Sequence, residues 1–227
     1  MADNDSAYGQ QQPSVGYSET DTILAVCKSL VSQLNTMKLV KVTKVTGGSE
    51  GEVAGRVEVQ PLVSQIDGNG YGTAHGIVPD IPWFRLQGGA NAVICEPVVG
   101  DIGFVVASDR DISKVKSTLA AALPGSRRTF DIADGIYVGG CLNVAPDQYL
   151  IFTEDSVRLV DKNGTSVSLA SGGFNLTDSH GNVISSGAGG ITITPGGAGT
   201  VTIHGKVFET HVHTGVTTGG GNSGPPL

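Results

Sequence analysis

The sequence predicts a mainly β protein with an N-terminal helix, a small barrel and a C-terminal rod made by three copies of the chain. Three observations lead to this fold class. Apolar residues recur at helical spacing between residues 18 and 36, and at every second position in short runs after that. After Pro146 these runs become shorter and are separated by clusters of turn residues. The chain ends in two histidines followed by a Gly-rich tail.

The N-terminal segment divides into a disordered arm (1–17) and a helix (18–36). The arm is rich in Gln, Gly, Ser and Asp, a composition typical of disorder. Ser18-Glu-Thr-Asp21 is a helix-start signal, because hydroxyl and acidic side chains cap free backbone donors. The apolar residues that follow are Ile23, Leu24, Cys27, Leu30, Val31 and Leu34. This stripe packs either on its own domain or on a neighbouring subunit or larger assembly.

Residues 37–145 are predicted to form a small barrel of the oligonucleotide/oligosaccharide-binding type, here called OB-like. Several short antiparallel strands with Gly and Pro turns between them are typical of such barrels. The expected strands are 39–46, 53–60, 93–99, 102–108 and 136–141, with a candidate short helix at 114–123.

Residues 146–210 are predicted to form a trimeric shaft. Alternating segments at 156–160, 166–169, 174–176, 191–194 and 200–204 each hold too few apolar residues to bury a core alone. In an intertwined trimer, these residues meet on the axis and the strand edges pair between chains, which gives a triple-stranded β-helix or β-prism. A monomeric β-solenoid is the alternative, but it needs a more regular repeat.

His211 and His213 are the candidate metal ligands. In one extended strand they would share a face with Val207, Ile203 and Val201, and would therefore point inward. One chain offers too few ligands for zinc, but a cyclic homotrimer would gather six histidines around one axis. Six nitrogens suit a single Fe²⁺ ion per trimer. Alternatively, both rings lie on a half-exposed strand and bind nothing.

Composition and spacing argue against several functions. A net charge of -7 disfavours binding to nucleic acid, which depends on neutralising phosphates. The three cysteines are odd in number and widely spaced, which indicates no disulfide framework. No secretory signal and no apolar run long enough for a membrane helix is visible, so we expect a soluble product made in the cytosol.

We expect no enzymatic activity. No nucleophile elbow, spaced catalytic triad or phosphate-binding loop is present in the sequence. A cupin-type metal site also uses His-x-His on a strand, but it requires a further Glu and His downstream, and neither follows His213. The remaining tail, 211–227, is expected to form the metal-binding tip and to fold back as a cap.

Three stretches carry a resemblance to a known family. Val98–Ile112 is similar to that family's Gly-Asp strand followed by an Asp-Arg-Asp turn. Arg127–Tyr137 resembles the segment leading from barrel to shaft, although Thr129 stands where a His is common. His211-Val-His213 with its Gly-rich, Pro-Pro-Leu tail matches an iron-binding tip. The sequence thus resembles the membrane-piercing central spikes of contractile-tailed phages, in particular the short baseplate spikes with an N-terminal OB-like barrel.

The resemblance implies a homotrimeric needle whose histidine pairs hold iron. It implies a structural role at the tip of the tail baseplate in the virion, after synthesis in the host cytoplasm. The N-terminal region would join the baseplate or tail hub protein, and sheath contraction would drive the needle through the bacterial outer membrane. The competing hypothesis is a trimeric tail fibre or adhesin tip that binds host surface glycans.

Overall fold

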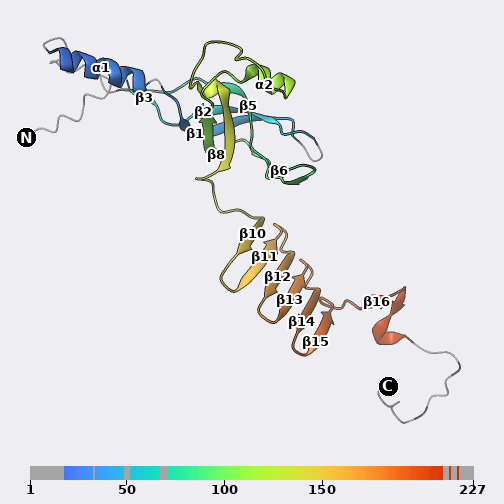
Figure 1. The fold of residues 1–227 in the computed structure, drawn as a ribbon. Helices are drawn as coiled ribbons and strands as arrows, with labels where there is room; N and C mark the ends of the chain where they lie inside the picture. The colour runs from blue at the N-terminus through green and yellow to red at the C-terminus, as the bar shows by residue number, and fades with distance from the viewer. Residues whose placement is uncertain are drawn as a thin grey trace, which may run out of the picture. The chain divides into compact units, whose positions relative to one another are not determined.

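The computed structural model describes residues 18–32, 34–48, 52–66, 71–211, 215 and 219. The chain divides into two compact units, here called unit 1 (Met1–Val144) and unit 2 (Ala145–Leu227). The described residues are mainly β, as predicted, and the α-helices lie in unit 1 (Figure 1). The predicted disordered arm, His213 and nearly all of the predicted capping tail lie outside the described residues.

Unit 1 is built on a five-stranded antiparallel sheet in the order β5-β2-β1-β8-β9. Its strands are β1 (Met37–Thr46), β2 (Arg56–Pro61), β5 (Val78–Pro82), β8 (Ile102–Ala107) and β9 (Gly135–Gly140). The sheet is a half-barrel whose edges approach each other where Trp83 forms a parallel bridge with Tyr137. There the Phe84 N–H donates to the Tyr137 carbonyl at 2.7 Å. The finer OB-like assignment stays a prediction.

The half-barrel encloses a small apolar core. Its buried members are Val40, Val42, Val57, Val59, Ile81, Trp83, Val105 and Tyr137. In β2 every second side chain is buried, which is the alternation expected of a strand with one face on a core. Gly103 lies where a Cβ atom would come within 2.6 Å of the Tyr137 hydroxyl oxygen, so glycine is needed for the ring to pack. Burial raises the pKa of Tyr137 to about 12.

Short elements occupy the connections of unit 1. They are β3 (Gln65–Ile66), β4 (Gly72–Thr73), β6 (Leu86–Gly88), β7 (Asn91–Val93), α2 (Ser113–Thr118) and the 3₁₀ helix η1 (Ile132–Asp134). The helix expected at 114–123 is shorter because Leu119 adopts a left-handed conformation that ends it. The strand expected at 93–99 is wrong beyond Val93, since Pro97 lacks a donor and Val98 and Asp101 form a turn.

α1 spans Glu19–Ser32 and confirms the N-terminal helix, although it ends before the expected residue 36. Its apolar stripe is not covered in the single chain: Ile23, Leu24, Leu30 and Val31 are each at least half exposed. Among the described residues, no helix is both long enough and apolar enough to cross a lipid bilayer.

Unit 2 begins with a six-stranded antiparallel sheet in sequence order. The strands are β10 (Tyr149–Phe152), β11 (Ser156–Val160), β12 (Ser166–Ala170), β13 (Gly173–Thr177), β14 (Val183–Gly187) and β15 (Gly190–Thr194). Figure 1 shows them as consecutive neighbours, each joined to the next by a short turn. A two-stranded hairpin follows, formed by β16 (Thr202–Ile203) and β17 (Lys206–Val207), and then the 3₁₀ helix η2 (Phe208–Thr210).

The strand pairing in unit 2 differs from the sequence expectation in one respect. Each strand from β10 to β15 pairs with the next strand of the same chain, whereas we expected strand edges to pair between chains. The backbone hydrogen bonds between these strands are therefore made within one chain. The apolar side chains of the sheet, by contrast, are not packed against another layer of the described chain.

Replacing a core residue tests the half-barrel. Ile81→Ala should lower the free energy of unfolding of unit 1 by about 2 to 5 kcal/mol, because it leaves a cavity beside Val57. Ile77→Ala is the matched control, since Ile77 is exposed and should change stability by less than about 0.5 kcal/mol. The single tryptophan, Trp83, lies in this core and reports its unfolding by fluorescence in urea. Equal midpoints for the two variants would contradict this core.

Candidate functional site

One face of the β10–β15 sheet carries a double row of side chains that are apolar except for Ser186. The first row runs through directly paired residues across all six strands: Leu150, Leu159, Val167, Leu176, Ile184 and Ile193. The second row lies two residues along each strand: Phe152, Val157, Leu169, Phe174, Ser186 and Ile191. Paired residues and residues two apart point to the same side of a sheet. We call these twelve residues the apolar face.

The opposite face of this sheet is different in chemistry. Its paired positions are mostly hydroxyl and amide side chains, with one charge, Arg158, opposite Ser168. Four larger apolar side chains also occur on it: Tyr149, Ile151, Val160 and Val183. The sheet is therefore amphipathic, with its uncharged apolar face on one side only.

No segment among the described residues covers the apolar face. Phe152 and Ile191 are each 72% exposed, and no described residue of unit 2 is buried. A single-layer sheet with exposed apolar side chains along its whole length lacks the core that holds a domain together. Unit 2 as a lone chain thus has hydrogen bonds between its strands but no packed interior.

The turns of the sheet repeat every 17 residues. Asp161–Thr165 and Asp178–Asn182 form equivalent loops. In each, the N–H of the first residue donates a hydrogen bond to the carbonyl of the last, and the Asp side chain accepts one from a backbone N–H. In both loops a glycine, Gly164 or Gly181, takes a positive φ. The same period relates apolar-face residues, for example Leu159 to Leu176. This period is a signal in the sequence that would have identified the double row.

The described end of unit 2, up to His211, does not form the single strand that we expected to start at Val201. His204 and Gly205 both have positive φ and make a two-residue hairpin turn between β16 and β17. Phe208–Thr210 then form η2, which breaks the alternation before His211. The argument that strand parity points His211 inward is therefore wrong, because the chain reverses and coils within the segment on which it relied.

His211 is nevertheless held in a defined way. Its Nδ1 lies 2.7 Å from the Phe208 carbonyl oxygen, and its ring lies 5.8 Å from the Phe208 ring between centroids. Because a carbonyl oxygen only accepts, Nδ1 carries the proton, and the lone pair of the neutral ring is on Nε2. This is the tautomer that metal-binding histidines use, with the other nitrogen bonded to a backbone carbonyl.

The described part of one chain holds no group of three or more His, Cys, Asp or Glu side chains placed to bind a metal. His213 lies outside the described residues, so the structure places only one of the two candidate ligands. Both remain predicted ligands.

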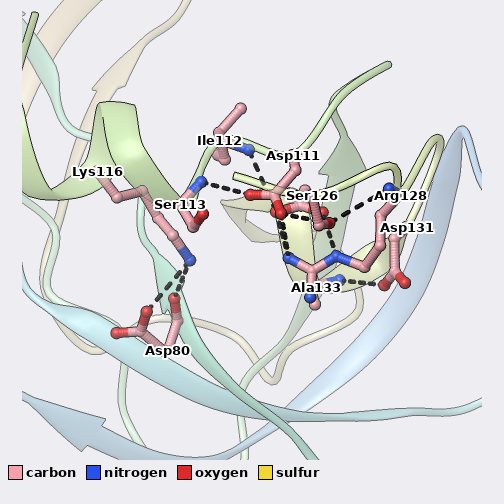
Figure 2. Close-up of polar contacts among 10 residues, drawn as sticks. Asp80, Asp111, Ile112, Ser113, Lys116, Ser126, Arg128, Asp131 and Ala133 are labelled. Carbon is pink, nitrogen blue, oxygen red and sulfur yellow. Dashed lines mark hydrogen bonds and ion pairs between the residues drawn. The ribbon is translucent and has the colours of Figure 1, made fainter. Parts of the chain in front are cut away.

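A polar cluster in unit 1 joins two of the stretches that carry the family resemblance. Arg128 forms a bidentate pair with Asp134, with Nε and Nη2 each 3.0 Å from a carboxylate oxygen. The same Nη2 lies 3.2 Å from Asp111 (Figure 2). Asp111 also accepts from the Ser126 hydroxyl at 2.6 Å and the Ser113 N–H at 2.8 Å. Both carboxylates are buried.

The physical effect of this cluster is to fasten a long loop to the half-barrel. Hydrogen bonds from Ser113 and Ser126, with the charge of Arg128, hold the pKa of Asp111 well below its usual range. The hydrogen bond to Asp134 raises the pKa of Arg128, so the guanidinium keeps its charge. All these side chains are engaged with one another, which indicates a structural role. The sequence contains both motifs but gives no reason to expect that their side chains meet.

No protein-family model matches the chain, and no curated protein sequence matches it significantly.

The cluster makes the stability of unit 1 depend on pH. Because folding depresses the Asp111 pKa, its contribution is fully present above the unfolded pKa of about 3.9 and is lost progressively as pH falls from there toward the folded pKa. Asp111→Asn should therefore lower the urea midpoint of Trp83 fluorescence at pH 7 and 5, and the difference from the parent should shrink toward pH 3. Asp147→Asn, at an exposed position in unit 2, is the control. A gap that is as large at pH 3 as at pH 7 contradicts this role.

Proposed function

We propose that the chain is the structural central spike of a contractile tail baseplate, which punctures the bacterial outer membrane as a homotrimer with an iron-stabilised tip. The observation that carries the proposal is the uncovered apolar face of unit 2. A covering partner must be apolar, as long as the sheet and continuous. Further copies of the same face meet all three requirements, and the face carries no charge that would repel a second copy.

Three copies fit this face better than two. The double row is only two side chains wide on each strand, which is about 7 Å, whereas two stacked sheets lie about 10 Å apart. A two-layer sandwich of such narrow faces would leave both margins open to water. Three faces meeting around an axis close all the margins and give a three-sided β-prism, with the Ser- and Thr-rich faces outside.

The proposed tip follows from the same threefold axis. Each chain would bring His211 and His213, so that six imidazoles surround one Fe²⁺ ion and link the three chains at the end of the shaft. The tautomer of His211 supports this role, since Nε2 carries the lone pair. Bound iron would supply a cross-link at the position where the ends of the shaft would otherwise fray.

Unit 1 is proposed to act as the collar that joins the spike to the tail hub. We assign its half-barrel to the OB-like class because five strands, incomplete closure and one crossing connection are typical of that class. The cluster at Asp111 and Arg128 would keep its long loop attached under load. The sequence resemblance in these stretches supports the same assignment.

A charge on the apolar face tests the trimer. Leu176→Asp places a carboxylate in the middle of the first row, where burial between copies should cost at least about 3 kcal/mol per chain. The variant should sediment as monomers, whereas the parent sediments as trimers. Asn175→Asp adds the same charge one residue away on the opposite face and should stay trimeric. A trimeric Leu176→Asp protein would overturn the proposed packing.

Metal analysis tests the tip. The purified protein should contain one iron per three chains, and His211→Ala with His213→Ala should abolish iron binding and lower the melting temperature while the trimer persists. His180→Ala, in an exposed turn, should leave both properties unchanged. Iron-free parent protein, or a double variant that keeps its iron, argues against the tip.

Glycan binding separates the spike from a receptor-binding fibre. A spike acts mechanically and should show no saturable binding to lipopolysaccharide or to outer-membrane vesicles. Specific saturable binding to either, with a dissociation constant that responds to competing free glycan, would favour the fibre.

A further inference from the structure

The half-barrel of unit 1 has a second apolar surface, on its outer side. Three directly paired side chains across β1, β8 and β9 form one row: Met37, Val106 and Ile136. Two residues along, Leu39, Phe104 and Val138 form the next. These side chains alternate with the buried core residues, so they point away from the core. Met37, Val106, Ile136 and Val138 are exposed. We call these six residues the outer patch.

α1 has the complementary shape. At 100° per residue, its larger apolar side chains fall on one side of the helix, which Glu19 shares at the N-terminal end, and Asp21 and Lys28 fall on the other. The apolar side consists of Ile23, Leu24, Val26, Cys27, Leu30, Val31 and, just after the helix, Leu34. The large members are exposed in the single chain.

The two surfaces match in size and in charge. Three strands span about 10 Å, which is the diameter of a helix with its side chains. Lys41 continues the outer side of β1 beyond Leu39, and Glu19 lies on the apolar side of α1 in its first turn. A helix laid across the outer patch would cover its apolar side chains and could bring opposite charges together at one end.

The chain between α1 and β1 opposes packing of the helix on its own sheet. The Leu34 N–H bonds the Val31 carbonyl at 3.1 Å and continues the last turn of the helix. The Asn35 N–H donates a hydrogen bond to the Phe130 carbonyl at 3.2 Å, and the Ala107 N–H donates one to the Thr36 carbonyl at 3.0 Å. These bonds tie residues 34–36 to the helix on one side and to the sheet on the other, and with the link held in this way α1 and the outer patch both stay exposed in the single chain.

We infer that α1 of each copy docks on the outer patch of a neighbouring copy, so that the copies exchange helices around the ring. The inference rests on the proposed homotrimer, in which each helix and each patch finds one partner by symmetry. Reciprocal helix docking would then add a contact to the collar of a trimer that the apolar face of unit 2 holds together.

Cross-linking of cysteines tests the exchange in the full chain. Cys27 lies on the apolar side of α1 and serves as one reporter, after Cys95→Ser and Cys141→Ser remove the other thiols. Val106→Cys places the second reporter at the centre of the outer patch. A short bifunctional maleimide should join Cys27 of one copy to residue 106 of another, giving covalent dimers and trimers on a denaturing gel. Thr46→Cys, at the exposed far end of β1, is the control and should give no such products.

Each outcome is informative. Products of higher mass with Val106→Cys alone support helix exchange. A product of single-chain mass that has lost both thiols shows docking on the same chain and overturns the inference. No product from a protein that sediments as a trimer overturns it as well, while leaving the proposed spike intact. A monomeric parent protein contradicts the trimer itself.

A second pair of variants, made in the reporter background, tests whether the cross-linked product depends on the apolar side of α1. In the reporter background, Leu30→Asn with Val31→Asn should reduce the cross-linked product at least tenfold, because both residues lie on the apolar side of α1. Lys28→Asn, on the polar side, should leave it unchanged. Neither variant should dissociate the trimer, since the apolar face of unit 2 is intact in both.

Discussion

The apolar face of unit 2 is the constraint on which the rest of the structure depends. The six strands satisfy one another's backbone hydrogen bonds within the chain, yet eleven of the twelve side chains on this face are apolar and none is buried. Hydrogen bonding alone contributes little net stability, so the sheet needs apolar burial that one chain does not provide. In the proposed trimer, assembly of identical copies would supply that burial and would set a common axis for everything that follows the sheet.

The sequence predicted the amphipathic strands correctly but not how they pair. Alternation of Val, Leu and Ile identifies a strand and its apolar side, and it placed β11, β12 and β15 well. It carries no information on whether an edge pairs within the chain or between chains. That choice is made by the loops, where Asp161 and Asp178 organise tight connections that return the chain beside the preceding strand.

At the tip, alternation in the sequence did not predict the local structure. Alternation through Val201, Ile203 and Val207 suggested one strand, but a His-Gly pair with positive φ at 204 and 205 reverses the chain. The role expected of His211 does not depend on that strand, because the hydrogen bond to Phe208 sets its tautomer locally. The cluster of Asp111, Arg128 and Asp134 was likewise not predictable, since its members come from separate loops and meet only in the fold.

The mass of the full chain in solution tests the central claim most directly. Sedimentation equilibrium at micromolar concentration should give three times the chain mass of 23.2 kDa, without detectable monomer. A folded protein of single-chain mass, with the β-sheet signal of unit 2 intact in circular dichroism, would show that the apolar face is stable uncovered and would contradict the account.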